Sequence, residues 1–324
     1  MESIMEYKEM IIRGLKNISL NHKPDSLYDP VKYFLDIGGK RVRPILTLMS
    51  SSSFNCEPKI ALNAALSVEL FHNFTLIHDD IMDSANSRRG KETIHNKWGI
   101  NSAILSGDVI LIMAYQLLEN YDNNTHIKLN KLLNKTAKEV CEGQQMDIDF
   151  ESKLNVSFEQ YIKMVSCKTA VLLGCSLKMG AIVAGASFED QDNIYKFGIN
   201  LGLAFQLQDD YLDIFGKENL VGKKIGGDII ENKKTVLYHM AMIDSNQNQK
   251  KHITELYNSK DISNKNKISK ITLLFKETKA DISSKKLIDQ YTKKAIDSIN
   301  RLSIDQNFKN KFIVFANNLM ERDL

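Results

Sequence analysis

The stretch LIHDDIMDSANSRRG, residues Leu76 to Gly90, combines acidic and basic side chains at close spacing. It holds three aspartates followed by two adjacent arginines: Asp79, Asp80, Asp83, Arg88 and Arg89. In a helix, Asp79 and Asp83 lie on one face, about 6 Å apart along the axis. Carboxylates are preferred ligands of Mg²⁺, whose shell is usually completed by water and substrate phosphates, and arginine binds phosphate oxygens. The stretch therefore predicts a metal-bridged phosphate site.

A second acidic triplet strengthens this interpretation, since a single one is more often a solvated helix face. The segment QLQDDYLDIF, residues 206–215, repeats the spacing with Asp209, Asp210 and Asp213. It follows the mostly apolar run 198–207, so these acids end a helix that faces the core. Two such helices facing each other would bring six carboxylates to one cavity, which is tolerable only with divalent cations.

Composition places the chain among soluble, helical globular proteins. Of its 324 residues, 43% are hydrophobic and 26% are charged, and there are only four prolines. Long runs with helical periodicity recur, whereas alternating strand patterns do not, which predicts an all-α fold. The net charge of +3 is too small to suggest binding to nucleic acid or to an anionic membrane.

Targeting and redox signals favour the cytoplasm. The four cysteines show no CxxC pairing, which predicts reduced thiols in a cytosol. The N-terminal sequence MESIMEYKEM has no basic region followed by an apolar one, so no signal peptide is expected. The most apolar stretch, 169–186, contains Lys178 and several small residues, so we expect a buried helix and no transmembrane segment.

The expected helices follow one another without a repeat period or a clear linker, so we predict one domain over residues 1–324. They cover residues 2–18, 31–36, 44–53, 58–83, 99–121, 125–147, 157–186 and 198–216, with a closing helix over 286–320. Residues 245–269 are polar and predict short solvated helices.

Several basic or polar side chains are candidate anion ligands. In GGKRVRP, residues 38–44, two glycines permit a tight corner that presents Lys40 and Arg41, although a glycine helix stop with solvated cations is the commoner explanation. His72 lies two turns before Asp79 on the same face, and is a candidate phosphate donor or else a core histidine. Lys168 lies in an apolar run and needs a partner or a cavity, so we expect it in the anion site.

Two further segments lie near these candidates. Gln144 and Asp147 are three residues apart on a helix end and could face the cavity, though such residues are more often solvated. The segment GKKIGGDIIENKKT, residues 222–235, is a glycine-rich basic loop containing Asp228, or simply a solvated surface loop.

These motifs, taken in order, resemble the trans-isoprenyl diphosphate synthases of the polyprenyl synthetase family. The resemblance covers residues 36–235 and extends more loosely to the C-terminus. It rests on GGKRVRP, ELFHNFTLIHDDIMD, SRRG, KTA, FQLQDDYLD and GKKIGGDIIENKKT. It implies an all-α, single-domain bundle of roughly ten or more helices around a deep central cavity, the isoprenoid synthase fold, and a homodimer.

The resemblance also implies roles for individual residues. Three Mg²⁺ ions would bind beside the substrate, with Mn²⁺ as a chemical substitute. Their ligands would be five aspartates, supported by Asp210: Asp79, Asp80, Asp83, Asp209 and Asp213. The allylic diphosphate would be held by Arg88, Lys168, Gln206, Lys223 and Lys233, with Thr169 beside the reacting carbons. Isopentenyl diphosphate would be held by Lys40, Arg41, His72 and Arg89.

The implied reaction is head-to-tail condensation of isopentenyl diphosphate with dimethylallyl, geranyl or farnesyl diphosphate. Metal ions and cations stabilise the departing diphosphate, the double bond of isopentenyl diphosphate attacks the allylic carbocation, and a proton is lost. Phe71, Phe74 and Thr75 precede the first triplet on the helix. In the family that the chain resembles, aromatics at both positions just before the first triplet accompany C15 products, whereas a single aromatic at the position of Phe74 accompanies C20 products. The large Phe74 beside the small Thr75 therefore favours geranylgeranyl diphosphate over farnesyl diphosphate. The alternative is that these aromatics are ordinary core residues and other residues limit the product length.

Departures and rival functions accompany the resemblance. Asn232 occupies a position where many relatives carry glycine, and the C-terminal ERDL lacks the basic ending of some farnesyl synthases. A terpene cyclase would not need GGKR together with a second full DDxxD, and a squalene or phytoene synthase lacks the isopentenyl site. A non-catalytic subunit of a heteromeric synthase would tend to lose one acidic motif, whereas both are complete here.

Overall fold

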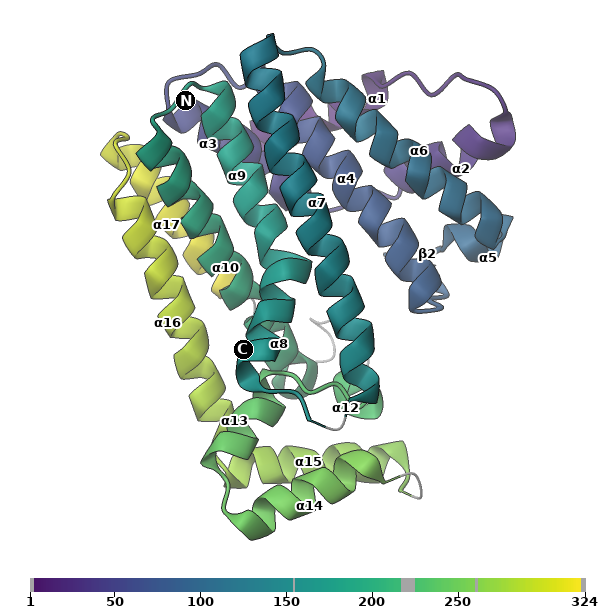
Figure 1. The fold of residues 1–324 in the computed structure, drawn as a ribbon, viewed down its shortest axis with the longest axis vertical. Coiled ribbons are helices and arrows are strands. Elements are labelled where there is room, and N and C mark those ends of the chain that lie inside the picture. The colour runs from purple at the N-terminus through teal and green to yellow at the C-terminus, as the bar shows by residue number, and fades with distance from the viewer. Residues whose placement is uncertain (1–2, 154, 217–224, 260–261, 322–324) are drawn as a thin grey trace. The chain divides into compact units, whose positions relative to one another are not determined.

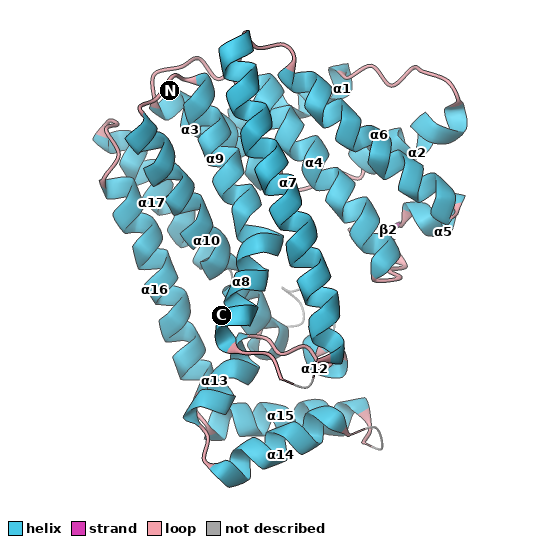
Figure 2. Cartoon of the chain, in the orientation of Figure 1, coloured by secondary structure: helices cyan, strands magenta, loops and turns pink. Residues whose placement is uncertain are grey.

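The computed structural model describes residues 3–153, 155–216, 225–259 and 262–321, and most of these are helical (Figure 2). One short antiparallel pair joins β1 (Ser87–Arg88) to β2 (Lys91–Glu92). The all-α prediction is therefore confirmed.

The helices in chain order are α1 (Ile4–Asn17), α2 (Asp25–Asp36), α3 (Val42–Ser53), α4 (Leu62–Met82), α5 (Ile94–Trp98), α6 (Ile100–Leu118), α7 (Asn123–Ser152), α8 (Phe158–Val165), the π-helix η1 (Ser166–Ala170), α9 (Val171–Val183), α10 (Phe188–Phe215), α12 (Gly227–Ile230), α13 (Val236–Asp244), α14 (Gln247–Asn258), α15 (Asn264–Glu277), α16 (Ala280–Asn300) and α17 (Gln306–Met320) (Figure 1).

The chain divides into two compact units. The first comprises residues 1–135 and 175–194, and the second comprises residues 136–174 and 195–324. The boundaries fall inside α7, α9 and α10, so each of these helices contributes to both units. The single-domain organisation stays a prediction.

In the first unit, α4 is the central helix, and it packs against α1, α3 and α6. Its consecutive buried residues, from Ala64 to Phe71, contact neighbours on several sides. The helix ends just after the first aspartates: the backbone N–H of Asp83 donates to the carbonyl of Asp79 at 2.8 Å, and that of Ala85 donates to Asp80 at 2.9 Å. These bonds satisfy carbonyls at the helix end, so the backbone there needs no other partner.

The core of the second unit is built by α8, α10, α13, α15 and α16. Its buried side chains include Tyr161, Leu207, Leu237, Ile271 and Ile288. Aliphatic and aromatic groups of this size supply most of the stabilisation in such a core. The long helix α10 carries both this apolar surface and, near its C-terminal end, the second acidic triplet.

Two predicted helices are interrupted in the structure, and two others begin earlier than predicted, α2 at Asp25 and α10 at Phe188. The predicted closing helix over 286–320 is wrong, because α16 ends at Asn300 and α17 begins at Gln306, where the carboxylate of Asp305 caps the backbone N–H of Asn307 at 2.7 Å. The helix expected over 157–186 is interrupted by the π-helical segment η1, which contains Lys168. A π segment widens the turn and is common at functional sites.

Among the described residues, two helical stretches are long and apolar enough to cross a membrane by length and composition alone. In residues 158–183, 83% of the apolar window is buried within the structure, as expected for the buried helix predicted there. In α6 the corresponding share is only 28%, so an apolar surface of this helix is uncovered.

Candidate active site

The first acidic triplet lies at the C-terminal end of α4, where Asp80 is buried and Asp83 is exposed. The Oδ1 atom of Asp80 accepts hydrogen bonds from Nε of Arg88 at 3.0 Å and from Nη2 at 2.5 Å. Its other oxygen, Oδ2, is buried with no hydrogen-bond partner among the described residues. A buried acceptor without a donor is costly, and a bound cation would satisfy it. Asp79 is half-buried beside it.

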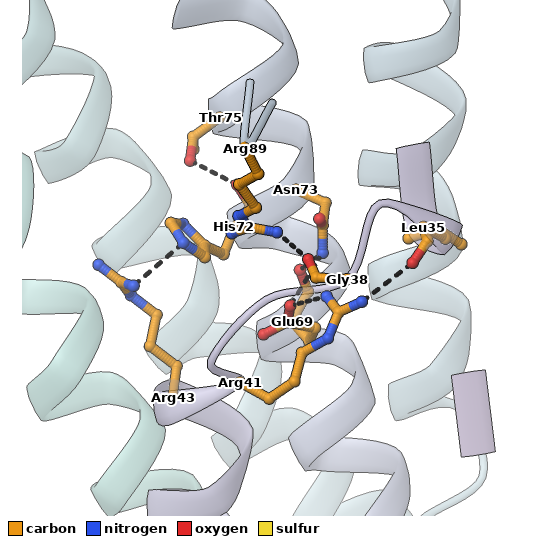
Figure 3. Close-up of polar contacts among 9 residues, drawn as sticks. All are labelled: Leu35, Gly38, Arg41, Arg43, Glu69, His72, Asn73, Thr75 and Arg89. Carbon is orange, nitrogen blue, oxygen red and sulfur yellow. Dashed lines mark hydrogen bonds and ion pairs between the residues drawn. The ribbon is translucent and has the colours of Figure 1, made fainter. Parts of the chain in front are cut away.

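A basic cluster is formed by Arg43, His72 and Arg89 (Figure 3). His72 lies on α4, Arg43 lies in the first turn of α3, and Arg89 follows β1. Nη1 of Arg43 is 3.1 Å from Nε2 of His72, and Nη1 of Arg89 donates to the carbonyl of Gly38. Gly39 has φ of +150°, and a Cβ there would lie 2.6 Å from Nη1 of Arg89. Glycine therefore lets the guanidinium of Arg89 lie across the loop.

The charges of the basic cluster are only partly compensated. Burial, followed by the positive charges of Arg43 and Arg89, holds the pKa of His72 well below its usual range, so its imidazole is neutral near pH 7. Burial also lowers the pKa of Arg43 to about 10, against the attraction of Glu69. The arginines remain charged near neutrality, and a group of cations with so little counter-charge is a natural anion site.

The structure gives Arg41 partners different from those that the sequence suggested. Arg41 is 6% exposed, and its guanidinium is paired with Glu69 and donates to the carbonyl of Leu35 at 2.9 Å (Figure 3). Glu69 also accepts from Nδ2 of Asn73 at 3.2 Å. Arg41 is thus a buried structural cation, and Arg43, which sequence reasoning missed, is the arginine in contact with His72. Lys40 is exposed.

The backbone of GGKRVRP explains why the two arginines differ. Arg41 directly precedes α3 and has a left-handed φ of +54°, whereas Arg43 lies in its first turn. Residues before and after such a reversal point to different sides, so the two arginines could not both be assumed to face one anion.

The three residues proposed to control chain length lie on α4. Phe71 is fully buried, and its ring centroid is 5.8 Å from that of the half-buried Phe74. The ring of Phe74 also lies edge-on to His78 at 4.7 Å. The hydroxyl of Thr75 donates to the carbonyl of His72 at 2.8 Å, so it is satisfied within the helix. Their effect on product length stays a prediction.

The second unit contains a cavity of about 130 Å³ that brings together most of the residues predicted there. Its lining includes five of the predicted ligands: Lys168, Thr169, Gln206, Asp210 and Lys233. The lining also includes Asp147, which the sequence placed either at the cavity or in solvent, and Asp228, for which the sequence predicted no role. Lys223 lies outside the described residues.

Lys168 is held by α7. Its Nζ lies 2.5 Å from Oδ2 of Asp147. Gly143, one turn earlier on α7, makes this possible, because a Cβ there would lie 2.3 Å from the backbone nitrogen of Lys168. The close approach of α7 to the π-helical segment places one cation and one carboxylate at the cavity wall, with both side chains partly exposed to it.

Asp210 is held by a chain of hydrogen bonds. Oδ1 accepts from Nε2 of Gln206 at 2.9 Å, and Oδ2 accepts from the hydroxyl of Tyr161. The hydroxyl of Thr169 in turn donates to Oε1 of Gln206 at 3.0 Å. Burial raises the pKa of Asp210 to about 6, although these hydrogen bonds oppose the shift. Both oxygens have protein donors, which suits the supporting role predicted for this residue.

Asp213 and Asp228 come together where α10 meets α12. The backbone N–H of Asp228 donates to Oδ2 of Asp213 at 3.1 Å. Burial, together with the negative charges of Asp210 and Asp213, raises the pKa of Asp228 to about 8, although Lys233 opposes the shift. Nζ of Lys233 lies 2.8 Å from Glu231. Burial alone would lower the pKa of Lys233, but Glu231, Asp147 and Asp228 raise it overall.

The aspartate carboxylates of the two units suit a hard cation such as Mg²⁺. Within the described residues, no three His, Cys, Asp or Glu side chains gather at metal-binding distances. Mg²⁺ often takes only one or two carboxylates and completes its shell with water and phosphate. The unpartnered Oδ2 of Asp80 and the raised pKa values of Asp210 and Asp228 indicate negative charge that such a cation would relieve.

Comparisons with known proteins agree with this chemistry. The family model described as polyprenyl synthetase matches residues 24–274. Geranylgeranyl diphosphate synthase of Methanosarcina mazei is 41% identical over 217 residues, which is 66% of this chain and 67% of that protein. The enzyme of the same name from Sulfolobus acidocaldarius is 35% identical over 293 residues, which is 89% of this chain and 88% of that protein.

A solved structure extends the likeness to the whole chain. A crystal structure of a geranylgeranyl pyrophosphate synthase is 45% identical, covers 100% of both chains and superposes with a TM-score of 0.94. Fold, motifs and family match therefore lead to one assignment: this chain, with its isoprenoid synthase fold, belongs to the polyprenyl synthetase family.

Proposed function

We propose that the protein is a short-chain trans-prenyltransferase that condenses isopentenyl diphosphate with an allylic diphosphate and forms geranylgeranyl diphosphate. The main observation is that each unit builds its own anion-binding environment from cations held beside an acidic triplet. Family membership and the similarity to geranylgeranyl diphosphate synthases support the reaction class and the C20 product.

Each environment is proposed to hold one substrate. Lys168 and Lys233 would hold the allylic diphosphate in the cavity of the second unit, with Gln206 and Thr169 beside them. The basic cluster, with Lys40, would hold isopentenyl diphosphate, and Arg43 takes the role that the family resemblance implies for Arg41. Mg²⁺, when bound to the aspartates of the two triplets, would neutralise the charge of the leaving diphosphate.

The side chains then contribute positioning and electrostatics. Lys168 and Lys233 stabilise negative charge as the allylic carbon–oxygen bond breaks. The double bond of isopentenyl diphosphate forms the new carbon–carbon bond, and the resulting cation loses a proton to the released diphosphate. The neutral His72 orients Arg43 and is not required as a base.

We also propose that the protein is a homodimer that covers α6. Four large apolar side chains of this helix are 40–57% exposed: Ile100, Ile104, Leu105 and Ile112. Such a surface is typical of a protein interface. Sedimentation of the protein should give a mass of two chains, and Ile112→Glu should shift it toward one.

The decisive experiment uses the purified protein alone with dimethylallyl diphosphate, radiolabelled isopentenyl diphosphate and Mg²⁺. Chromatography of the dephosphorylated products should show geranylgeraniol, and EDTA should abolish it. Farnesol as the main product would shift the assignment to the C15 alternative. A cyclised hydrocarbon would favour a terpene cyclase, and no product without a second protein would favour a non-catalytic subunit.

A further inference from the structure

A buried lysine of α15 lies outside the residues that the proposed reaction uses. Lys267 is only 5% exposed. Its Nζ donates to Oδ1 of Asn232 and to the carbonyl of Tyr257, the latter at 3.1 Å. In the part of the chain that the structure describes, both acceptors are neutral. Burying an ammonium on neutral acceptors costs free energy, so stability alone does not explain this arrangement.

The acceptor Asn232 follows α12 in an unusual backbone conformation. Its φ is +59°, and asparagine tolerates this left-handed region better than most residues. Glycine would adopt the same backbone but would offer no side-chain acceptor. The asparagine therefore supplies what glycine cannot, namely an amide oxygen for Lys267.

The segment between Gly226 and Lys233, here called the Asp228 segment, is fixed at both ends. At its start, the N–H of Gly226 donates to the backbone carbonyl of Asp213 at 2.8 Å, and the N–H of Asp228 donates to the side-chain carboxylate of Asp213. Ile268 of α15 lies against Gly226: a Cβ added at Gly226 would be 2.7 Å from Cδ1 of Ile268. At its end, Lys267 holds Asn232.

The two neighbouring residues of α15 thus contact both ends of the segment that presents Asp228 and Lys233 to the cavity. The N–H of Lys233 donates to the carbonyl of Asp228 at 2.9 Å, so a displacement of Asn232 would move both side chains. We propose that Lys267 and Asn232 are positioning residues that hold Asp228 and Lys233 for binding of the allylic diphosphate. This inference rests on the proposed function of the cavity.

Two single variants test the pair. Asn232→Gly keeps the backbone conformation and removes the acceptor, whereas Lys267→Met keeps the side-chain length and removes the donor. Each should raise the KM for the allylic diphosphate about tenfold, the effect expected from losing one charged hydrogen bond. The KM for isopentenyl diphosphate should change less than about twofold. Lys270→Met, at an exposed position of the same helix, is the matched control and should behave as the wild type.

Further variants separate positioning from general destabilisation. The double variant should be no worse than the poorer single variant, because the two residues act through one bond. Asn232→Asp should restore a wild-type KM, since a carboxylate also accepts from Lys267. Additive losses in the double variant, or a lower kcat with both KM values unchanged, would overturn the proposal.

Hydrogen exchange provides a readout that does not need turnover. In the metal-free protein, amides of residues 226–235 should exchange faster in Asn232→Gly and Lys267→Met than in the wild type or Lys270→Met. Unchanged exchange would contradict the positioning role. If the wild type makes no prenyl product but exchange rises as expected, the proposed function fails while the role of the pair in ordering this segment stands.

Discussion

The two acidic triplets share one spacing but lie in opposite electrostatic surroundings. At the end of α4, Asp80 is neutralised by Arg88, and the basic cluster lies beside this helix, with His72 on it and Arg43 on α3. On α10, Asp210 is satisfied by a tyrosine and an amide, and further acids crowd the cavity, so carboxyl pKa values rise. The first triplet has a cation of the protein as its counter-charge, whereas the second depends more on protons or on a metal that is bound.

The largest effect should come from removing either triplet. Asp79→Ala and Asp209→Ala should each lower kcat at least ~10³-fold, because a preorganised charge contact is lost in the transition state. Asp297→Ala, at an exposed position of α16, is the control. Steady-state rates with and without Mg²⁺ check this. Near-normal turnover in one variant would mean that only one triplet binds the catalytic metal.

Within the first unit, substitutions of Arg41 and of Arg43 should have different effects on stability. Arg41→Met leaves Glu69 buried and unpaired, so the free energy of unfolding should fall by about 3 kcal/mol or more. Arg43→Met should cost far less stability. Urea unfolding of both variants measures the difference. An equal loss would show that Arg43, like Arg41, has a structural role.

The two anion sites should also separate kinetically. Arg43→Ala, Lys40→Ala and His72→Ala should raise the KM for isopentenyl diphosphate, whereas Lys168→Ala should raise that for the allylic diphosphate. Loss of one charged contact should raise the KM by about 10–100-fold. Steady-state measurements that vary each substrate in turn decide the assignment, which would be refuted by equal changes in both KM values.

A pH dependence should distinguish the surroundings of the second triplet, which include Asp228, from those of the first. The pKa of Asp228 is raised to about 8, above the ordinary value near 4, so the folded metal-free protein holds a proton that the unfolded chain has lost. This contribution to stability is complete below about pH 4 and disappears as the pH rises through about 8, with a slope of about 1 kcal/mol per pH unit. Asp228→Asn should remove it.

Urea unfolding of both proteins in EDTA at several pH values measures this slope. Mg²⁺ added at pH 7 should release protons from the wild type and fewer from Asp228→Asn, which calorimetry in buffers of different ionisation enthalpy detects. Parallel stability curves for the two proteins would show that Asp228 does not carry the proton.

The smallest expected effect concerns product length. Phe74→Ala removes a half-buried ring beside Phe71 and His78, so longer products should appear if this ring closes the channel. Chromatography of dephosphorylated alcohols measures the distribution, and Phe188→Ala, at the exposed start of α10, serves as the control. An unchanged product distribution would mean that other residues close the channel.

Much of the candidate site was accessible from the sequence, because metal and phosphate chemistry restricts which residue types can serve. Lys168, Thr169, Gln206, Asp210 and Lys233 were predicted and line one cavity. Asp228 was visible in its loop, but its proximity to Asp213 was not. The helix break after Asn300 was missed because the amphipathic pattern continues across it.

The sequence by itself determined the all-α class, the two triplets and the family resemblance, since these depend on local periodicity and on motifs read in order. The tertiary structure decided which arginine is structural and which is available to an anion, because Arg41 finds Glu69, which lies 28 residues away along the chain. It also decided that Lys267 reaches Asn232, 35 residues away. Such partners are selected by packing and burial, which make a buried charge take the nearest acceptor that the fold provides.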